Sequence, residues 1–468
     1  MYIYNTLSRQ KEKLIPSQDK DIRMYCCGVT VYDKCHIGHA RSLYLFDIIT
    51  RYLRHRGYNV KFIRNITDVD DKIIKKANEQ NKSFDEVVKE NITLYEKDLE
   101  RLDISKADCE PRATENINDM ITHIEGLIDR GYAYEVDGDV YFCVRKFKQY
   151  GSLSGQSIEK MLEAVRIELD SRKRDPLDFA LWKKAKAGEP FWDSPWGKGR
   201  PGWHIECSVM SRKFLKTDTL DIHAGGRDLI FPHHENEIAQ AEALTGKQFA
   251  RYWMHNGLLT INGQKMSKSL GNFITIEEAV KRYSADNIKL FFISSHYASD
   301  IDFTDDKLNE AQKQRRAFGE FFNKVHTWQK MDNQPMEASD KDIAKVDDIV
   351  RMFYDAMDDD FNTPAALGAM FKLIDIGARF ISANKKDAFI YVYDKITIFF
   401  DILGLTMPQE LDIPDEVKDM IRERQQAKKQ KDFVKADAIR ERIQQQFGLS
   451  VIDTAGGGVV FTRRMDIE

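Results

Sequence analysis

Residues 22–64, IRMYCCGVTVYDKCHIGHARSLYLFDIITRYLRHRGYNVKFIR, decide the fold of this 468-residue chain. Residues 22–27 are mostly apolar and predict a buried strand, whereas residues 42–54 carry apolar side chains at helical spacing and end before Gly57. Residues 60–64 predict a second strand. A strand, a helix and a strand in this order form a right-handed unit with parallel strands. The segment therefore predicts an α/β fold with a Rossmann-like, doubly wound parallel sheet.

Two short segments predict where chemistry takes place. The first signature, residues 36–39 (HIGH), follows the first strand and opens the helix. Its two imidazoles and Gly38 meet backbone N–H groups and the positive end of the helix dipole, which together favour an anion. The second signature, residues 265–269 (KMSKS), places two lysines on a loop, as phosphoryl-type chemistry requires. The pair predicts a site that activates a nucleoside triphosphate.

The remaining pattern divides the chain into five segments. We expect residues 1–111 and 201–305 to be the two halves of the nucleotide-binding domain, with later strands at 221–223 and 255–259 and a helix at 233–244. Residues 112–200 predict an insertion between the halves. Residues 306–405 read as successive helices and predict a bundle. After a linker containing prolines, residues 406–468 predict a small mixed α/β module. Its helical stretch at 418–442 is basic, which suits contact with nucleic acid but is also common on a solvent-exposed helix face.

Composition excludes several classes of protein. The net charge of -4 argues against a wholly basic nucleic-acid coat protein but allows a local basic face. Neither a signal peptide nor an apolar run of membrane-spanning length occurs, so we expect a cytoplasmic protein without membrane contacts. We also expect a monomer. The 6 cysteines are few for this length and do not resemble a disulfide framework.

Four residues from distant segments form a candidate metal site, because they combine two thiolates, one imidazole and one carboxylate. They are Cys27, Cys207, His233 and Glu237. The last two are four residues apart on a helix predicted to begin after Pro232, so they share one face, whereas His234 has Ile238 at the matching place and is the poorer ligand. This donor set suits Zn²⁺. The plain alternatives are buried structural cysteines and a His–Glu salt bridge within one helix.

Further motifs occur in order along the chain. They are CGVTVYD at 27–33, NITD at 65–68, GWHIEC at 202–207, FPHHENE at 231–237, MDDDFNTP at 357–364 and KADAIR at 435–440. With the two signatures they resemble the bacterial-type cysteinyl-tRNA synthetases, a family of class I aminoacyl-tRNA synthetases, over almost the whole chain. The chain departs from the family near its end, where AGGG at 455–458 and FTRR at 461–464 replace a Pro-Gln-Gly turn and a Trp-Arg-Arg run.

The resemblance implies an activity and its cofactors. The family activates L-cysteine with ATP to cysteinyl-adenylate and transfers it to the terminal ribose 2′-OH of tRNA(Cys). The resemblance also implies one Zn²⁺ per chain on the four candidate ligands, with the sulfur of the substrate as a further ligand, and Mg²⁺ accompanying ATP. Zinc prefers a thiolate to a hydroxyl, which would separate cysteine from serine.

The resemblance also implies roles for single residues. His36 and His39 would contact the ATP phosphates and Gly38 would let the adenine approach, while Lys268, supported by Lys265, would neutralise the departing pyrophosphate. Residues for the other substrate groups are Thr67 for the amino acid, Trp203 as a wall of the side-chain pocket and Asp228 for a ribose hydroxyl. Trp203 also has the plain reading of a core aromatic.

Two other functions remain open at this point. A cysteine ligase acting on an amino sugar would share the activation and zinc sites, but the C-terminal module argues against it. A non-catalytic paralogue that binds tRNA as a scaffold is the second alternative. The intact signatures and the complete set of candidate ligands argue against that one.

Overall fold

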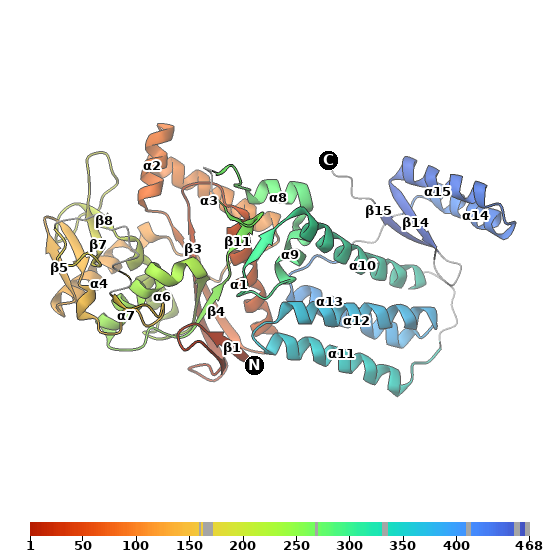
Figure 1. Ribbon diagram of the computed structural model, residues 1–468, viewed down its shortest axis with the longest axis horizontal. Helices are drawn as coiled ribbons and strands as arrows, with labels where there is room; N and C mark the ends of the chain where they lie inside the picture. Colours follow the sequence, from red (N-terminus) through yellow and green to blue (C-terminus); the bar gives the residue numbers. More distant parts are fainter. Residues whose placement is uncertain are drawn as a thin grey trace. The chain divides into compact units, whose positions relative to one another are not determined.

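Two compact units make up the computed structural model, which describes residues 1–158, 161, 172–266, 270–329, 336–408, 413–453 and 459–463 (Figure 1). Unit 1 contains Met1–Ala279, Tyr297–Phe303 and Asp359–Phe361. Unit 2 contains Val280–His296, Thr304–Asp358 and Asn362–Glu468. Both signatures and all candidate metal ligands belong to unit 1.

A four-stranded sheet of order β10-β9-β3-β4 forms the centre of unit 1, and all its pairings are parallel. Its strands are β3 (Asp21–Thr30), β4 (Asn59–Thr67), β9 (Leu220–Gly226) and β10 (Ala250–Asn256). Helix α1 (Ile37–His55) connects β3 to β4, which confirms the predicted β-α-β unit. The strands are buried along most of their length, as expected of a parallel sheet covered on both faces.

Three predicted elements have different bounds in the structure. Helix α1 begins at Ile37, with His36 as its N-cap, so the first signature opens the helix as expected and the helix is longer than the apolar stretch at 42–54. The single strand predicted at 255–259 is wrong: β10 ends at Asn256 and β11 (Leu259–Ile261) starts another sheet, since Gly257 passes so close to Ser299 that a Cβ there would lie 2.2 Å from its carbonyl oxygen. Helix α7 (Glu235–Thr245) begins after a π-helical turn, Ile230–His234, in which Phe231 is extended, as the residue before a proline prefers.

The other elements of unit 1 surround this sheet. Before the insertion lie the hairpin β1 (Tyr2–Asn5) and β2 (Gln10–Lys13) and the helices α2 (Asp71–Gln80) and α3 (Phe84–Arg101). Helix α4 (Ile117–Asp129) precedes an antiparallel sheet of β5 (Ala133–Val136), β6 (Asp139–Phe142), β7 (Phe179–Lys184) and β8 (Gly199–Pro201), followed by α6 (Trp203–Leu215). A small sheet of order β12-β11-β13 contains β12 (Gln264–Lys265) and β13 (Ile301–Phe303).

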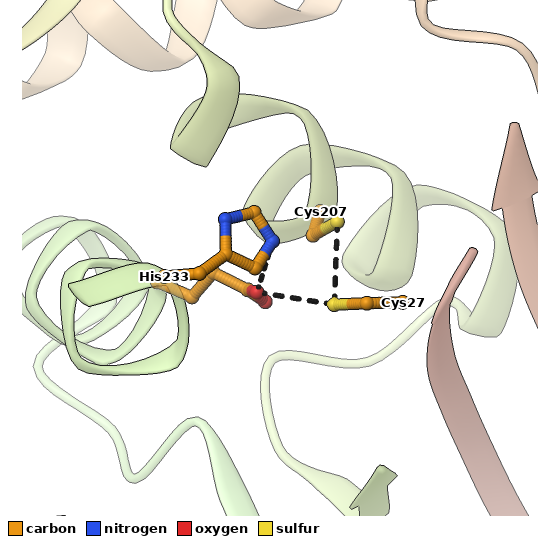
Figure 2. Close-up of side chains that lie close together, drawn as sticks. Cys27, Cys207 and His233 are labelled. Atoms are coloured by element: carbon orange, nitrogen blue, oxygen red, sulfur yellow. Dashed lines mark hydrogen bonds and ion pairs between the residues drawn. The ribbon is translucent and has the colours of Figure 1, made fainter. Parts of the chain in front are cut away.

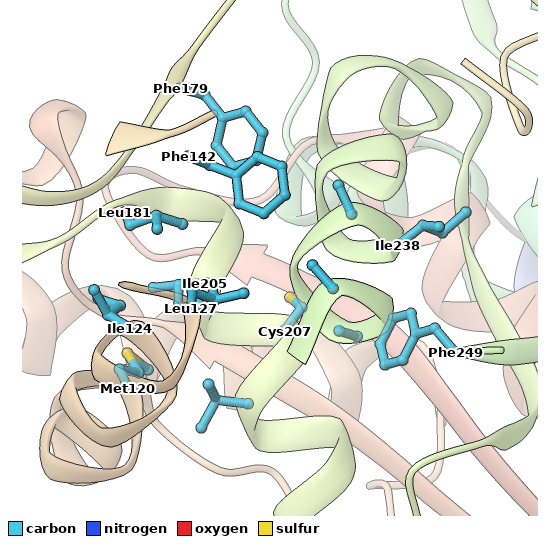
Figure 3. Packing of buried hydrophobic residues seen from close by; sticks show 14 of the residues in the cluster. Met120, Ile124, Leu127, Phe142, Phe179, Leu181, Ile205, Cys207, Ile238 and Phe249 are labelled. Carbon is cyan, nitrogen blue, oxygen red and sulfur yellow. The ribbon is translucent and has the colours of Figure 1, made fainter. Parts of the chain in front are cut away.

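One buried cluster joins the insertion to the parallel-sheet domain. Figure 3 shows Met120, Ile124 and Leu127 of α4 near Ile205 of α6, with Phe142 and Phe179 stacked at a centroid distance of 5.0 Å. Cys207 lies within this cluster and is 2% exposed. The helix that carries this thiol is therefore anchored by apolar packing, and the position of the thiol follows from the packing of the core.

Unit 2 is helical apart from one hairpin among its described residues. Its helices include α9 (Ala285–Ile293), α10 (Asp305–Gln329), α11 (Asp340–Asp358), α12 (Thr363–Ser382) and α13 (Lys386–Ile402). The last four agree with the run of helices predicted at 306–405, whereas α9 lies before that range although it belongs to unit 2. Helix α8 (Ile276–Tyr283), which the division into units splits after Ala279, precedes these helices. The end of the chain has α14 (Asp415–Lys429), α15 (Phe433–Phe447) and the hairpin β14 (Leu449–Asp453) and β15 (Val459–Arg463), around a small core of its own. In the part of the chain described, no helix is both long and apolar enough to cross a bilayer.

Candidate active site and metal centre

The four candidate metal ligands converge on one point. Cys27 lies on β3, Cys207 on α6, His233 in the π-helical turn and Glu237 on α7, and their ligating atoms all lie within 4.8 Å of one another. Figure 2 shows the side chains of Cys27, Cys207 and His233 directed toward one another. The sulfurs are 3.6 Å apart, Cys27 Sγ is 3.3 Å from Glu237 Oε1, and His233 Nε2 is 3.0 Å from the same oxygen. We call these four residues the Cys27 cluster.

A β-bulge turns Cys27 toward this cluster. The pairing of β3 with β4 shifts register between Cys26 and Val29. At Gly28 the chains approach so closely that a Cβ would lie 1.6 Å from the carbonyl oxygen of Asn65, and the Gly28 N–H donates to Asn65 Oδ1 at 2.8 Å. Bulges commonly redirect one side chain at the end of a strand. Any side chain at residue 28 would therefore displace the backbone that presents Cys27.

Buried charges compete for protons within the Cys27 cluster. Burial raises the pKa of the Cys27 thiol well above its ordinary value, and the neighbouring Cys207 adds to that increase. Burial also opposes ionisation of Cys207, but hydrogen bonds with Cys27 and His233 outweigh it and lower the pKa of Cys207 to about 6. Burial disfavours the charged forms of both His233 and Glu237. The Glu237 carboxylate nevertheless raises the pKa of His233 to about 10, and His223 and His233 hold the pKa of Glu237 well below its usual range. A cation entering the cluster would replace the protons that these donors share.

The spacing of the donor atoms fits a tetrahedral zinc ion. Two sulfurs at about 2.3 Å from such an ion lie about 3.8 Å apart, and a sulfur and an oxygen lie about 3.5 Å apart. The observed distances of 3.6 Å and 3.3 Å are close to these values. Two thiolates, one imidazole and one carboxylate also match the ligand preferences of zinc.

Two further histidines border the same point. His223 and His234, with Cys27 and Glu237, form a second group whose ligating atoms lie within 4.8 Å of one another. His234 Nε2 is 3.3 Å from Cys27 Sγ, so His234, predicted to be the poorer ligand, also lies next to the Cys27 cluster. It ends the π-helical turn, in which the regular spacing of an α-helix does not apply. His223 Nε2 lies 2.7 Å from Glu237 Oε2, leaving Oε1 facing Cys27 and His233.

The candidate residues for the amino acid also border the cluster. The indole of Trp203 stacks on His233 with a centroid distance of 4.2 Å, which places it beside the Cys27 cluster. A cavity of 330 Å³ lies next to Trp203 and His204, and Lys183 and Arg200 also line it. Thr67 is buried and its hydroxyl donates to Glu206 Oε2 at 2.8 Å. A ligand therefore has room next to Trp203, whereas the hydroxyl of Thr67 already has a protein partner.

The first signature caps its own helix. His36 is the N-cap of α1, and its Nδ1 accepts from the N–H groups of Gly38 and His39 at 3.1 and 3.3 Å. In return His39 Nδ1 accepts from the His36 N–H at 3.2 Å, and the two rings stack at 3.7 Å. The sequence predicted that backbone N–H groups at the start of the helix would bind an anion, but the N–H groups of Gly38 and His39 donate to His36 instead. An anion would instead meet the Nε2 edges of the imidazoles.

Gly38 has a specific steric role in this cap. A Cβ at this position would lie 2.9 Å from His36 Cε1 and 3.0 Å from its Nδ1. The next nearest atom is Cε of Met266, at 3.6 Å. The beginning of the second signature therefore lies over the beginning of α1.

The other predicted residues for ATP are placed as follows. Lys265 ends β12, is exposed, and its carbonyl oxygen accepts from the Asn272 side chain at 3.3 Å. Lys268 lies outside the described residues. Asp228 is exposed in a 3-10 turn, Arg227–Leu229, directly after β9, and its Oδ1 would lie 2.5 Å from a Cβ at Gly226. Because parallel strands present ligands at their carboxyl ends, Asp228 lies on the expected edge of the sheet.

Reasoning from the sequence missed three residues that border the site. Asn65 Oδ1 contacts Cys207 Sγ at 3.7 Å, Glu206 accepts from Thr67, and His223 contacts Glu237. Asn65 and Glu206 lie within the quoted motifs NITD and GWHIEC. His223 carries a weaker signal, a polar side chain within an apolar strand. Such a residue needs a buried partner.

Comparison with family models places the chain among known proteins. Residues 13–313 match the model described as tRNA synthetases class I (C) catalytic domain, and residues 352–407 match the DALR domain. The chain is 48% identical over 468 residues to the cysteine–tRNA ligase of Thermodesulfovibrio yellowstonii, covering 95% of this chain and 96% of the relative. It is 46% identical over 481 residues to the cysteine–tRNA ligase of Oleidesulfovibrio alaskensis, covering 98% of this chain and 99% of the relative.

Solved structures share the fold at low sequence identity. The methionyl-tRNA synthetase of Mycobacterium tuberculosis in complex with methionyl-adenylate has a TM-score of 0.63 at 16% identity, over 83% of this chain and 92% of that one. A putative arginyl-tRNA synthetase from Campylobacter jejuni has a TM-score of 0.58 at 14% identity, over 83% of this chain and 94% of that one. These similarities support the α/β parallel-sheet fold with an insertion and a helical domain.

Proposed function

The chain belongs to the cysteine–tRNA ligase family of class I aminoacyl-tRNA synthetases, and we propose that the Cys27 cluster is the zinc site through which it selects its amino acid. The protein is a cysteine–tRNA ligase, which couples cysteine to tRNA(Cys) at the expense of ATP. This family membership removes the amino-sugar ligase and the scaffold as functions. The observation that carries the zinc proposal is the convergence of four donors from four separate elements.

Selection of cysteine follows from the chemistry of the donors. When bound by Cys27, Cys207, His233 and Glu237, Zn²⁺ supplies a preference for a thiolate over the hydroxyl of serine. An apolar pocket alone would discriminate poorly between two side chains of such similar size. His223 holds one carboxylate oxygen of Glu237 and so keeps the other turned toward the cluster. Trp203 would close the pocket over His233.

His36 and His39 would donate hydrogen bonds to the ATP phosphates. Each Nδ1 accepts an N–H in the capping arrangement, so a neutral ring carries its proton on Nε2. Burial and the neighbouring His36 lower the pKa of His39 well below its ordinary value, which keeps that ring neutral at pH 7. The cap therefore prepares two Nε2–H donors. Lys265 and Lys268 would add positive charge as pyrophosphate leaves, and Mg²⁺ would accompany ATP.

The remaining site residues have supporting roles in this proposal. Thr67, whose hydroxyl donates to Glu206, would help to seat the amino acid, and Asp228 would accept from a ribose hydroxyl. For tRNA, we propose that residues 306–405 support the stem and residues 406–468 read the anticodon. The exposed side chain of Phe433 and the basic residues of α14 and α15 support nucleic-acid contact at that end.

The first test is ATP–pyrophosphate exchange with each of the twenty amino acids, followed by charging of tRNA. Exchange with cysteine and formation of cysteinyl-tRNA are expected, together with one zinc per chain by metal analysis. Activity with fewer than one tenth of the chains containing zinc would refute the zinc proposal while leaving the ligase activity in place. Absence of cysteine-dependent exchange would refute the function.

A further inference from the structure

Arg41 is a buried cation that contacts four backbone carbonyl groups. It lies on α1 and is 0% exposed. Its Nη1 donates to the carbonyl oxygens of Gly257 and Leu258 at 2.7 and 2.9 Å, and its Nη2 donates to those of Tyr297 and Ser299 at 3.2 and 2.5 Å. Bonds from a charged donor are stronger than those between neutral groups. One guanidinium therefore fixes two chain segments that lie about forty residues apart in sequence.

These two segments lead into the sheet that carries the second signature. Leu258 directly precedes β11, and Ser299 lies just before β13. Strand β11 pairs with β13 in parallel and with β12 in an antiparallel hairpin that ends at Lys265. Arg41 therefore holds the base of the hairpin on which the second signature begins.

The same helix carries the first signature. Arg41 follows His39 by two residues on the first turns of α1, whose cap is formed by His36. The chain after the second signature is tied to this helix too, because the Ile37 N–H donates to the carbonyl oxygen of Ile274 at 3.0 Å. The second signature is thus attached to α1 on both sides, by Arg41 before it and by a backbone bond after it.

The contacts leave little freedom around the guanidinium. A Cβ at Gly257 would lie 2.2 Å from the carbonyl oxygen of Ser299, so the two segments touch beside Arg41. Burial lowers the pKa of Arg41 to about 10, and Asp300 partly opposes this decrease, so the side chain stays charged at neutral pH. Lysine cannot reproduce four bonds from one planar fork.

We propose that Arg41 is a positioning residue for the activation step: it holds the hairpin that carries Lys265 in place relative to His36 and His39. The inference rests on the proposed function, because it assumes that both signatures act on ATP. Arg41 itself touches no reacting group. It acts through the carbonyl groups of Gly257, Leu258, Tyr297 and Ser299.

A double-mutant cycle tests this role in the full-length protein. Arg41→Lys, Lys265→Ala and the double variant are compared by cysteine-dependent ATP–pyrophosphate exchange at saturating substrate. A displacement of about 1 Å costs about 100-fold in rate, which is the expected loss of kcat in Arg41→Lys, with KM for cysteine and zinc content unchanged. Because both changes act on the contribution of Lys265, kcat of the double variant should fall no further than kcat of the weaker single variant. Arg51→Lys is the matched control on the same helix, since Arg51 pairs with Asp47 and donates to Ser105, and it should keep wild-type kcat.

A second variant guards against loss of folding. In Arg41→Ala, about 20 mM guanidinium should restore exchange at least tenfold, because a free guanidinium ion can occupy the vacated position. Losses that multiply in the double variant, or an Arg41→Lys enzyme with normal kcat per folded chain, would overturn the inference. If the wild-type protein showed no cysteine-dependent exchange, the proposed function itself would be refuted. That outcome differs from an active wild-type enzyme in which the losses of kcat in the two single variants multiply in the double variant, which would refute only the role of Arg41.

Discussion

Replacing Gly38 with alanine tests whether the first signature works through its capping geometry. The added Cβ would lie 2.9 Å from His36 Cε1 and 3.0 Å from its Nδ1, closer than real contacts allow. The imidazole is the movable partner, so we expect it to rotate away from α1. The His36 ring would then lose its bonds from the N–H groups of Gly38 and His39.

The effects on stability and on activity should separate. Loss of the cap costs about 1 kcal/mol, while alanine gains up to about 1 kcal/mol over glycine in a helix, so the net change in unfolding free energy is close to zero. The Nε2 donor of His36 would move by about 1 Å or more, which costs about 100-fold in rate. We therefore expect Gly38→Ala to lower kcat for ATP–pyrophosphate exchange about 100-fold with little change in thermal midpoint.

Gly368→Ala is the control for this experiment. Gly368 lies within α12, and a Cβ there would meet no atom within 4 Å. This change should raise stability by up to about 1 kcal/mol and leave exchange unaltered. If Gly38→Ala kept exchange within twofold of the wild type, the argument that the cap orients His36 would be refuted.

Three further predictions concern other parts of the chain. Cys207→Ser should lose zinc and accept serine as a substrate in the exchange assay. Lys268→Ala should instead slow the activation step while zinc stays bound. If metal analysis found a full complement of zinc in the Cys207 variant, Cys207 would not be a zinc ligand. Burial lowers the pKa of His123 to about 4, and nearby Arg212 adds to the decrease, so the unfolded chain binds the proton more readily. The stability that His123 contributes is therefore present above about pH 6.5, and about 3 kcal/mol of unfolding free energy is lost as pH falls toward 4. Denaturant melts at several pH values should show this decrease in the wild type and a smaller decrease in His123→Phe. An equal pH dependence in the two proteins would contradict the prediction. Changing Arg463 and Arg464 to alanine should weaken tRNA binding and reduce its salt dependence without affecting exchange, and an unaltered affinity in filter binding would exclude the C-terminal run from the tRNA site.

Local patterns predicted the elements well where neighbours in sequence decide the conformation. The apolar run at 22–27 and the helical spacing at 42–54 became β3 and α1, and Met266 of the second signature lies next to Gly38 of the first. One prediction was wrong where distant groups intervene: the strand expected at 255–259 breaks because Gly257 passes against Ser299. The contact of His234 with Cys27 was not predicted, and it occurs at the π-helical turn before α7.

The sequence by itself determined which chemical groups are present and in which elements they lie, because side-chain periodicity and capping are short-range effects. It could also propose Cys27, Cys207, His233 and Glu237 as partners from their chemistry. Only the tertiary structure brought them within 4.8 Å, since Cys27 and Cys207 are 180 residues apart and meet through the packing of α6 and the bulge of β3. The same holds for His223 beside Glu237 and for Arg41 under the hairpin of the second signature. Such contacts depend on the register and packing of distant segments, which no local pattern records.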